Sequence, residues 1–219
     1  MYFILHPITS INHLIARLIA DQVTLVISIL FFLFLCANYK KPSFQNLDNN
    51  VQSWALASNG GFFKNHAEDF AIFGNAVFHI LFCVVLSIIF LIAKHTFSTV
   101  IAVIFTLIFS WGLNRLMKLI YRRERPGNIQ NGIRKRMSYC FPSGHVMASI
   151  GIYFFCAMIL QGLMPFLPWF IIALFLSVSV IMSRIYLGHH YFTDILGGIA
   201  SGIFCLNVSI WFYFLVSLI

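Results

Sequence analysis

Six long apolar segments occupy most of this 219-residue chain, and they restrict its fold more than any other feature. Their approximate limits are 22–39, 71–93, 97–117, 145–162, 166–187 and 194–217. A helix needs about 20 apolar residues to cross the hydrocarbon core of a bilayer, and each segment approaches or reaches that length. A span must also satisfy its backbone polar groups internally, and the segments lack the two-residue alternation of a membrane barrel. We therefore predict an all-α, polytopic membrane protein with six transmembrane helices.

The composition agrees with a bilayer environment. Hydrophobic residues make up 60% of the chain, charged residues make up 9%, and the mean hydropathy is +0.90. Such a sequence is too apolar to cover a water-facing surface. We expect residues 1–219 to form a single membrane domain. We expect no cleaved signal peptide, because the N-terminus has neither an early basic region nor a small-residue cleavage pattern.

Two further segments suit the membrane interface. Residues 3–20 alternate apolar and polar side chains, and the stretch from Leu47 to Phe63 places Val51 and Trp54 among polar residues. Both patterns are compatible with short amphipathic helices that lie along the bilayer surface.

The lengths of the connections decide which polar residues can meet. The loops after residues 93, 162 and 187 are very short, so the helices that they join are antiparallel neighbours. Counting crossings places the end of the third helix, the start of the fourth, the end of the fifth and the start of the sixth at one membrane face. The polar motifs of the chain occur at these four places.

The first motif is the segment KLIYRRERP at the end of the third predicted helix. Lys118, Arg122 and Arg125 follow helical spacing, and Pro126 is expected to stop the helix. Cations aimed at one point can hold the oxygens of a transferring phosphoryl group. Basic side chains that snorkel to the interface, a solvated loop or a topology signal would also explain them. The basic cluster also suits anionic lipid headgroups, and its candidate contacts are Arg122, Arg123, Arg134, Lys135 and Arg136.

The second motif, Phe141 to His145, directly precedes the fourth helix. A helix N-terminus is an anion site, so main-chain amides near Ser143 and Gly144, with the Ser143 hydroxyl, could hold phosphate oxygens. His145 is close enough to protonate a leaving alkoxide. An ordinary helix cap at Ser143 is the simpler alternative.

The third motif, SRIYLGHHYFTD, contains Ser183, Arg184, His189, His190 and Asp194. Asp194 is one of only six acidic residues and stands at the start of a long apolar run, a costly position for an unpartnered carboxylate. A carboxylate bonded to one imidazole nitrogen leaves the other nitrogen free to attack phosphorus. Asp194 could instead only cap the helix. Local chemistry hardly distinguishes His189 from His190 as the nucleophile. The spacing to Asp194 weakly favours His190.

Together, Lys118-x6-Arg125-Pro126, Pro142-Ser143-Gly144-His145 and Ser183-Arg184-x5-His190-x3-Asp194 resemble the three ordered motifs of the type 2 phosphatidic acid phosphatase (PAP2) superfamily. The resemblance covers about residues 70–217, so we expect a PAP2-type catalytic core at 71–217. It implies His190 as nucleophile, Asp194 as its orienting carboxylate and His145 as general acid. It also favours His190 over His189. The phosphate ligands that it implies are Lys118, Arg125, Ser143, Gly144 and Arg184.

The resemblance implies a membrane lipid phosphatase that works through a phosphohistidine and needs no cofactor. The sequence has no Walker A loop, no GxSxG elbow and no acidic cluster for magnesium, so we expect metal-independent chemistry without a metal site. Two alternatives stay open: a phosphotransferase, in which a second lipid takes the phosphoryl group, and a non-catalytic lipid-binding or transport protein. A vanadate-binding haloperoxidase shares the motifs but not the membrane spans.

The expected partners are an anionic lipid substrate and the bilayer, and no nucleic acid. The basic loop favours a multiply charged headgroup, which ranks undecaprenyl pyrophosphate and lipid A ahead of phosphatidylglycerol phosphate and phosphatidic acid. We expect a multi-pass protein of the bacterial inner membrane whose site faces the periplasm, as in similar enzymes. The positive-inside rule argues the other way, because most Lys and Arg lie on the site's face.

Overall fold

A computed structural model of the protein describes residues 11–58, 60–93, 97–126, 129–130, 133–134 and 139–218. The described chain is helical apart from a small hairpin, β1 (Ile129–Gln130) and β2 (Ile133–Arg134), which confirms the all-α prediction. The helices are α2 (Ile11–Asn38), α3 (Pro42–Ala57), α4 (Phe62–Asn65), α5 (Ala67–Phe73), α6 (Ala76–Ile92), α7 (Phe97–Tyr121), α8 (Gly144–Leu163), α9 (Trp169–Tyr186) and α10 (Phe192–Ser217).

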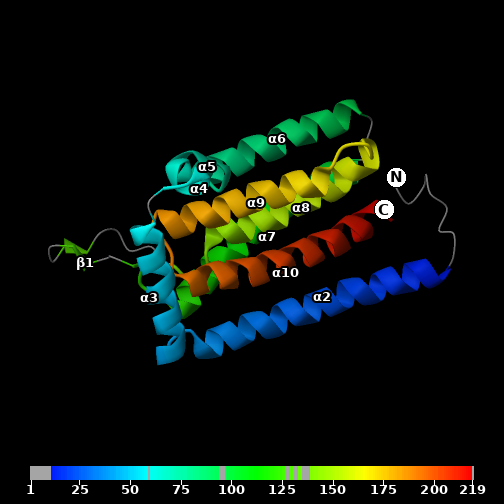
Figure 1. Ribbon diagram of the computed structural model, residues 1–219. Coiled ribbons are helices and arrows are strands. Elements are labelled where there is room, and N and C mark those ends of the chain that lie inside the picture. Colours follow the sequence, from blue (N-terminus) through cyan, green and yellow to red (C-terminus); the bar gives the residue numbers. More distant parts are fainter. Residues whose placement is uncertain are drawn as a thin grey trace.

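The long helices form an antiparallel bundle, and α3 lies across one end of it (Figure 1). By length and apolar composition, four helices can each cross a membrane: α7, α8, α9 and α10. Two bent pairs, α2 with α3 and α5 with α6, bring the number of candidate spans up to six. Large apolar side chains such as Ile27, Val84 and Leu174 are exposed on the outside of the bundle. Exposed apolar surface of this extent suits contact with lipid tails.

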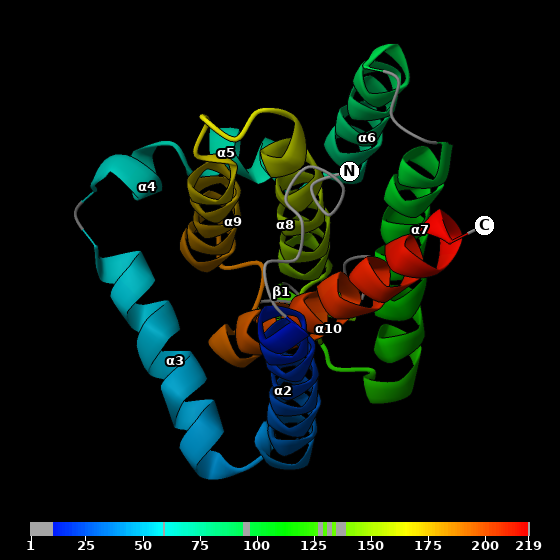
Figure 2. The same cartoon turned by 90° about the vertical axis from the view of Figure 1, so that its right-hand side faces the viewer.

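Helix α8 lies between α7, α9 and α10 and is buried on most of its surface (Figure 2). Its close contact with α10 depends on Gly198 and Gly202, a G-x-x-x-G pair on one face of α10. A Cβ atom added at Gly198 would lie 2.8 Å from the Ser143 carbonyl oxygen, and one at Gly202 would lie 2.9 Å from the Met147 carbonyl oxygen. Small residues let membrane helices approach at backbone distance, so these glycines fix where the start of α8 meets α10.

Three predicted helix limits were wrong. α2 runs without a break from Ile11 to Asn38, so no separate surface helix covers residues 11–20. The rest of the segment expected at 3–20 lies outside the described residues. The second predicted helix is divided by a 49° bend between α5 and α6. The bend falls at Gly74, where a Cβ atom would lie 2.8 Å from Val180 and 3.1 Å from His145, so the chain passes closer than a larger residue allows.

The third error concerns the end of α7. The helix stops at Tyr121, before Pro126, and Arg122 then takes a left-handed conformation with φ +47°. Arg122 and Arg125 therefore do not continue the helical face of Lys118. The chain turns here instead of extending the row of cations.

The interfacial helix expected within 47–63 is present as α3, although it begins earlier, at Pro42, and ends at Ala57. Proline suits the first position of a helix, because the amide it lacks has no helical partner there. Trp54 and Leu56 are exposed on α3, and the Trp54 ring lies 5.7 Å from the Tyr186 ring at the end of α9. α3 thus contacts the end of the bundle at which α9 ends.

Candidate active site

The three sequence motifs meet at the end of the bundle that α3 covers (Figure 1). Lys118 lies in the last turn of α7, His145 in the first turn of α8 and Arg184 in the last turn of α9. His145 interacts electrostatically with Lys118, Arg184 and His190, and Arg125 interacts with Lys118, Arg184 and His190. The structure therefore gathers the basic and imidazole groups that the sequence placed on one membrane face.

His190 lies in the short connection between α9 and α10 and is 5% exposed. Its Nδ1 atom faces Asp194 Oδ2 at 3.5 Å, an ion-pair distance that is too long or poorly aligned for a hydrogen bond, and Nε2 has no hydrogen-bond partner among the described residues. Burial lowers the pKa of His190 to about 4, although the neighbouring Asp194 carboxylate acts in the opposite direction. The imidazole is therefore neutral at neutral pH, with a lone pair available on Nε2.

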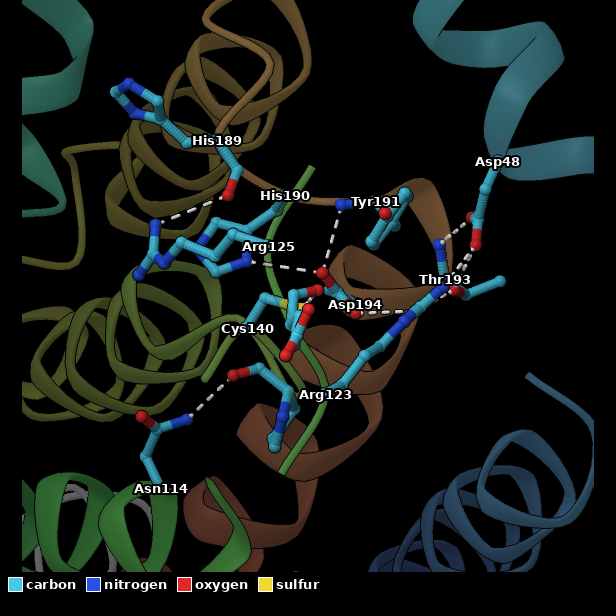
Figure 3. A network of polar contacts seen from close by, with 12 residues as sticks. Asp48, Asn114, Arg123, Arg125, Cys140, His189, His190, Tyr191, Thr193 and Asp194 are labelled. Atoms are coloured by element: carbon cyan, nitrogen blue, oxygen red, sulfur yellow. Dashed lines mark hydrogen bonds and ion pairs between the residues drawn. The ribbon is translucent and has the colours of Figure 1, made fainter. Parts of the chain in front are cut away.

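His189 differs from its neighbour in every respect that matters for a nucleophile. Its side chain is exposed and points away from Asp194, and its main-chain carbonyl accepts a hydrogen bond from Arg125 Nη1 at 3.3 Å (Figure 3). The carboxylate partner belongs to His190 alone of the two. The geometry agrees with the preference that the motif spacing gave.

Asp194 makes two kinds of contact. As the third residue of α10 it accepts the Tyr191 amide on Oδ2 at 3.0 Å, so it does cap the helix. The same oxygen faces His190, and Oδ1 accepts a hydrogen bond from Arg123 Nη1 at 2.7 Å. The carboxylate is 0% exposed, so these partners replace the water that a charged group would otherwise keep.

The start of α8 is fastened to α10 and α7. The Ser143 amide donates to the Asp194 carbonyl at 2.9 Å, and Asn114 Nδ2 donates to the Pro142 carbonyl at 3.1 Å. Because the Ser143 amide is occupied, main-chain contacts to an anion would have to come from Gly144 and His145. A Cβ atom at 144 would lie 2.5 Å from Asn114 Oδ1, so a larger residue there would require the Asn114 side chain to move.

Several buried polar atoms around this site have no hydrogen-bond partner in the described part of the chain. They include Ser143 Oγ, Arg184 Nη2 and His190 Nε2. Ser143 is the N-cap residue of α8, yet its hydroxyl makes no capping hydrogen bond. Buried polar groups are nearly always satisfied, so the Ser143 hydroxyl and the Arg184 guanidinium, which come from two motifs and can donate hydrogen bonds, indicate a ligand rich in hydrogen-bond acceptors.

A cavity of about 350 Å³ adjoins the site. Its wall includes Lys118, Gly144 and His145, together with Arg115 and Trp111 from α7. Arg115 is exposed and lies one helical turn from Lys118 on the same face. A charged side chain at membrane depth is costly, which makes Arg115 a candidate for binding an anionic group.

The residues expected to contact the lipid headgroup lie in different environments. Arg122 is exposed, whereas Arg123 turns inward and forms ion pairs of 2.7 Å with both Asp48 and Asp194. The headgroup contacts expected of these two residues stay predictions. The Arg123 guanidinium is held by buried carboxylates, and Asp194 and Asp48 raise its pKa against the effect of burial. The Arg134 side chain, Lys135 and Arg136 lie outside the described residues.

Sequence reasoning missed Asp48, Asn114 and the glycines of α10. Asp48 is 1% exposed and accepts the amide and hydroxyl of Thr193, each at 2.8 Å. One signal was available, because Asp48 is the only charged residue in α3. The G-x-x-x-G spacing in α10 was likewise visible in the sequence.

Comparison with known proteins places these features in a family. The model of the PAP2 superfamily matches residues 99–217, which contain all three motifs. Phosphatidylglycerophosphatase B of Bacillus subtilis is 38% identical over 96 residues, which cover 42% of this chain and 46% of that protein. The alignment thus spans about half the length of that curated relative.

A solved structure gives a similar result over a longer stretch. The transmembrane PAP2-type phosphatidylglycerolphosphate phosphatase of Bacillus subtilis matches with a TM-score of 0.77 and 26% identity. The match covers 86% of this chain and 95% of that one. The shared fold, the candidate spans and the family match lead to one conclusion: the chain is a multi-pass membrane protein of the PAP2 superfamily.

Proposed function

We propose that the protein is an integral membrane lipid phosphatase that removes phosphate from an anionic lipid through a phosphohistidine on His190. The observation that supports this most is the buried imidazole of His190. One of its nitrogens faces Asp194, and the other has no hydrogen-bond partner in the described chain. Lys118 and Arg125 are near enough to His190 to interact with it electrostatically. A neutral nucleophile beside fixed cations suits attack on a phosphoryl group.

The reaction consists of two displacements. In the first, the His190 Nε2 lone pair forms a bond to phosphorus, and the bond from phosphorus to the lipid oxygen breaks as His145 gives that oxygen a proton. Asp194 stabilises the positive charge that develops on the ring. In the second, His145 takes a proton from water, the water oxygen bonds to phosphorus, and the phosphorus–nitrogen bond breaks.

The remaining residues of the motifs hold the phosphoryl oxygens. Lys118, Arg125 and Arg184 supply positive charge, and Ser143 Oγ with the amides at Gly144 and His145 supplies hydrogen bonds. All of these residues except Arg125, which lies in the loop after α7, are at the ends of three packed helices, and this packing keeps them in place before the reaction begins. Preorganised charges of this kind account for most of the stabilisation of a phosphoryl-transfer transition state. The chemistry requires no metal ion or cofactor.

For the substrate, we place phosphatidylglycerol phosphate beside undecaprenyl pyrophosphate and lipid A, ahead of phosphatidic acid. The two similar Bacillus subtilis proteins are named for phosphatidylglycerol phosphate. All three leading candidates carry more than one phosphate. Arg115, in the cavity wall beside Lys118, is placed to bind the group that is not transferred.

The test is phosphate release by the purified protein in detergent with EDTA present, using these four lipids. His190→Ala should reduce release to the background rate, whereas His189→Ala, the matched control, should keep most of the activity. A parallel assay with added acceptor lipids distinguishes hydrolysis from phosphotransfer. Full activity of His190→Ala would refute the proposed nucleophile, and inactivity of well-folded wild-type protein on every lipid would refute the phosphatase.

We also propose that the protein lies in the bacterial inner membrane with its site facing the periplasm. The whole chain would then be one membrane domain, with a catalytic core over 71–217. α10 starts beside the site and ends at the opposite end of the bundle, so the C-terminus would lie in the cytoplasm (Figure 1). The positive-inside count still opposes this, though less so because Arg123 is held inside the protein. A reporter that is active only in the cytoplasm, fused after Ile219, decides between the two orientations.

A further inference from the structure

An acidic residue far from the three motifs is built into the candidate site. Asp48 belongs to α3, whose other described features are those of a helix at the bilayer surface, with Trp54 and Leu56 exposed. Asp48 itself is buried, and its two oxygens accept three hydrogen bonds: from the Thr193 amide, the Thr193 hydroxyl and Arg123 Nη2. Burying a carboxylate on a surface helix is costly, so the contacts that it makes there call for an explanation.

Arg123 connects Asp48 to Asp194, the carboxylate that faces the proposed nucleophile His190. Its Nη2 atom bonds to Asp48 Oδ2, and its Nη1 atom bonds to Asp194 Oδ1, both at 2.7 Å (Figure 3). Nη1 also donates to Thr193 Oγ1 at 2.6 Å. The guanidinium group also lies over two aromatic rings, with its central carbon 5.0 Å from the centre of the Tyr39 ring and 4.2 Å from that of Tyr191. These two carboxylates and two rings restrict the orientation of the guanidinium.

The consequence concerns the orientation of Asp194. Its Oδ1 atom is bound by Arg123, which leaves Oδ2 for the Tyr191 amide and His190 Nδ1. Without Arg123, the buried carboxylate would lose its charge partner, and rotation about its side-chain bonds could exchange the two oxygens. The position of the His190 ring would then be less well defined, because Asp194 is the group that Nδ1 faces.

We propose that Arg123 and Asp48 are positioning residues for phosphoryl transfer, which hold Asp194 so that it orients His190. α3 is then part of the catalytic unit, although it lies N-terminal to the segment 99–217 that matches the family. The inference rests on the proposed function, since it assigns His190 as the nucleophile. Neither Arg123 nor Asp48 is required to touch the lipid.

The first measurement does not depend on activity. Nitrogen-15 NMR of histidine-labelled protein, with the His190 signals assigned through His190→Gln, reports which ring nitrogen carries the proton. In the wild type we expect the proton on Nδ1, facing Asp194. Arg123→Lys keeps the charge but loses the two-pronged contact, and Asp48→Asn loses one ion pair. Both should shift His190 toward a mixture of tautomers, whereas Asp69→Asn, an exposed acid-to-amide control in α5, should not.

The second measurement is kinetic, on the same purified variants and the preferred lipid. We expect kcat to fall on the order of 10- to 100-fold in Arg123→Lys and Asp48→Asn with KM nearly unchanged, because misplacement of a reacting group by about 1 Å can cost that much. Added to Asp194→Asn, Arg123→Lys should cause little further loss. Thermal unfolding of each variant separates misfolding from misplacement.

Three results would overturn the inference: an unchanged His190 tautomer in both variants, unchanged kcat in both, or a loss from Arg123→Lys that is undiminished in Asp194→Asn. A wild type that is inactive on all lipids would refute the proposed function instead, and the NMR comparison would still decide whether Arg123 and Asp48 position His190.

Discussion

The contact between Gly198 and the start of α8 gives a prediction whose size follows from the structure. In Gly198→Ala, the new Cβ atom would lie 2.8 Å from the Ser143 carbonyl oxygen, 0.6 Å short of the 3.4 Å at which ordinary contact begins. Val146 Cβ, at 3.0 Å, blocks movement in a second direction. Both obstacles belong to the first turns of α8 and not to flexible side-chain ends. The helix start must therefore move by several tenths of an ångström.

Two effects should follow from this movement. Overpacking of a close contact costs about 1–3 kcal/mol, so the Tm should fall by roughly 5 °C. Ser143, Gly144 and His145 would move with the helix start and lose their alignment with His190. Since a displacement of about 1 Å can cost a factor of about 100 in rate, we expect kcat to fall on the order of tenfold.

The chain supplies a matched control for this substitution. Gly112 lies in α7, and a Cβ atom there would meet no atom within 4 Å. Gly112→Ala should keep wild-type kcat and leave the Tm unchanged or higher, because alanine favours a helix by about 1 kcal/mol over glycine. Thermal unfolding and phosphate release in the same detergent measure both effects. A Gly198→Ala protein with the Tm and kcat of Gly112→Ala would refute the assignment of a close helix contact that aligns the site.

Three further outcomes are expected. Asp194→Asn should lower kcat by a factor on the order of 10³ with little change in KM, because the amide cannot stabilise a charged His190 ring. Steady-state phosphate release measures this change, and a loss of kcat below about tenfold would contradict the proposed role of Asp194. The folded-state pKa of His190 is about 4, below its ordinary value. As the pH falls from about 6.5 to 4, the unfolded chain therefore takes up a proton before the folded protein does, and the free energy of unfolding should drop by on the order of 3 kcal/mol. The wild-type Tm should therefore fall more steeply than that of His190→Gln between pH 7 and 4, and equal slopes would be inconsistent with a buried neutral imidazole. Arg115→Gln should raise KM for phosphatidylglycerol phosphate roughly three- to tenfold more than for phosphatidic acid, and equal changes for the two lipids would argue against a second anion contact.

The membrane architecture could be predicted because it depends on local features of the sequence. Apolar run lengths fixed the spans to within a few residues for α8, α9 and α10, and short loops fixed which helix ends share a face. The span lengths and the short loops together predict that Lys118, His145 and His190 lie at the same end of the bundle. The break at Gly74 could not be predicted from an uninterrupted apolar run, because its cause is contact with Val180 and His145 from other helices.

The contacts of Arg123 could not be predicted from the sequence, for a similar reason. A cluster of neighbouring cations looks uniform in sequence, and the left-handed turn at Arg122 sends the next side chain inward. Its partner Asp48 lies 75 residues away in a helix that the motifs do not include. The available signal was that Asp48 is the only charged residue in a surface helix. This indicates a buried partner for Asp48 but does not identify that partner.

The most direct test of the central claim is to look for the phosphohistidine itself. Wild-type protein would be mixed with its preferred lipid carrying ³²P in the transferred phosphate, quenched at millisecond intervals in alkali, digested and mapped. The account predicts a transient label, stable in alkali and lost in acid, on the peptide that contains His190. Full turnover without any label on that peptide, or a label carried by another side chain, would contradict it.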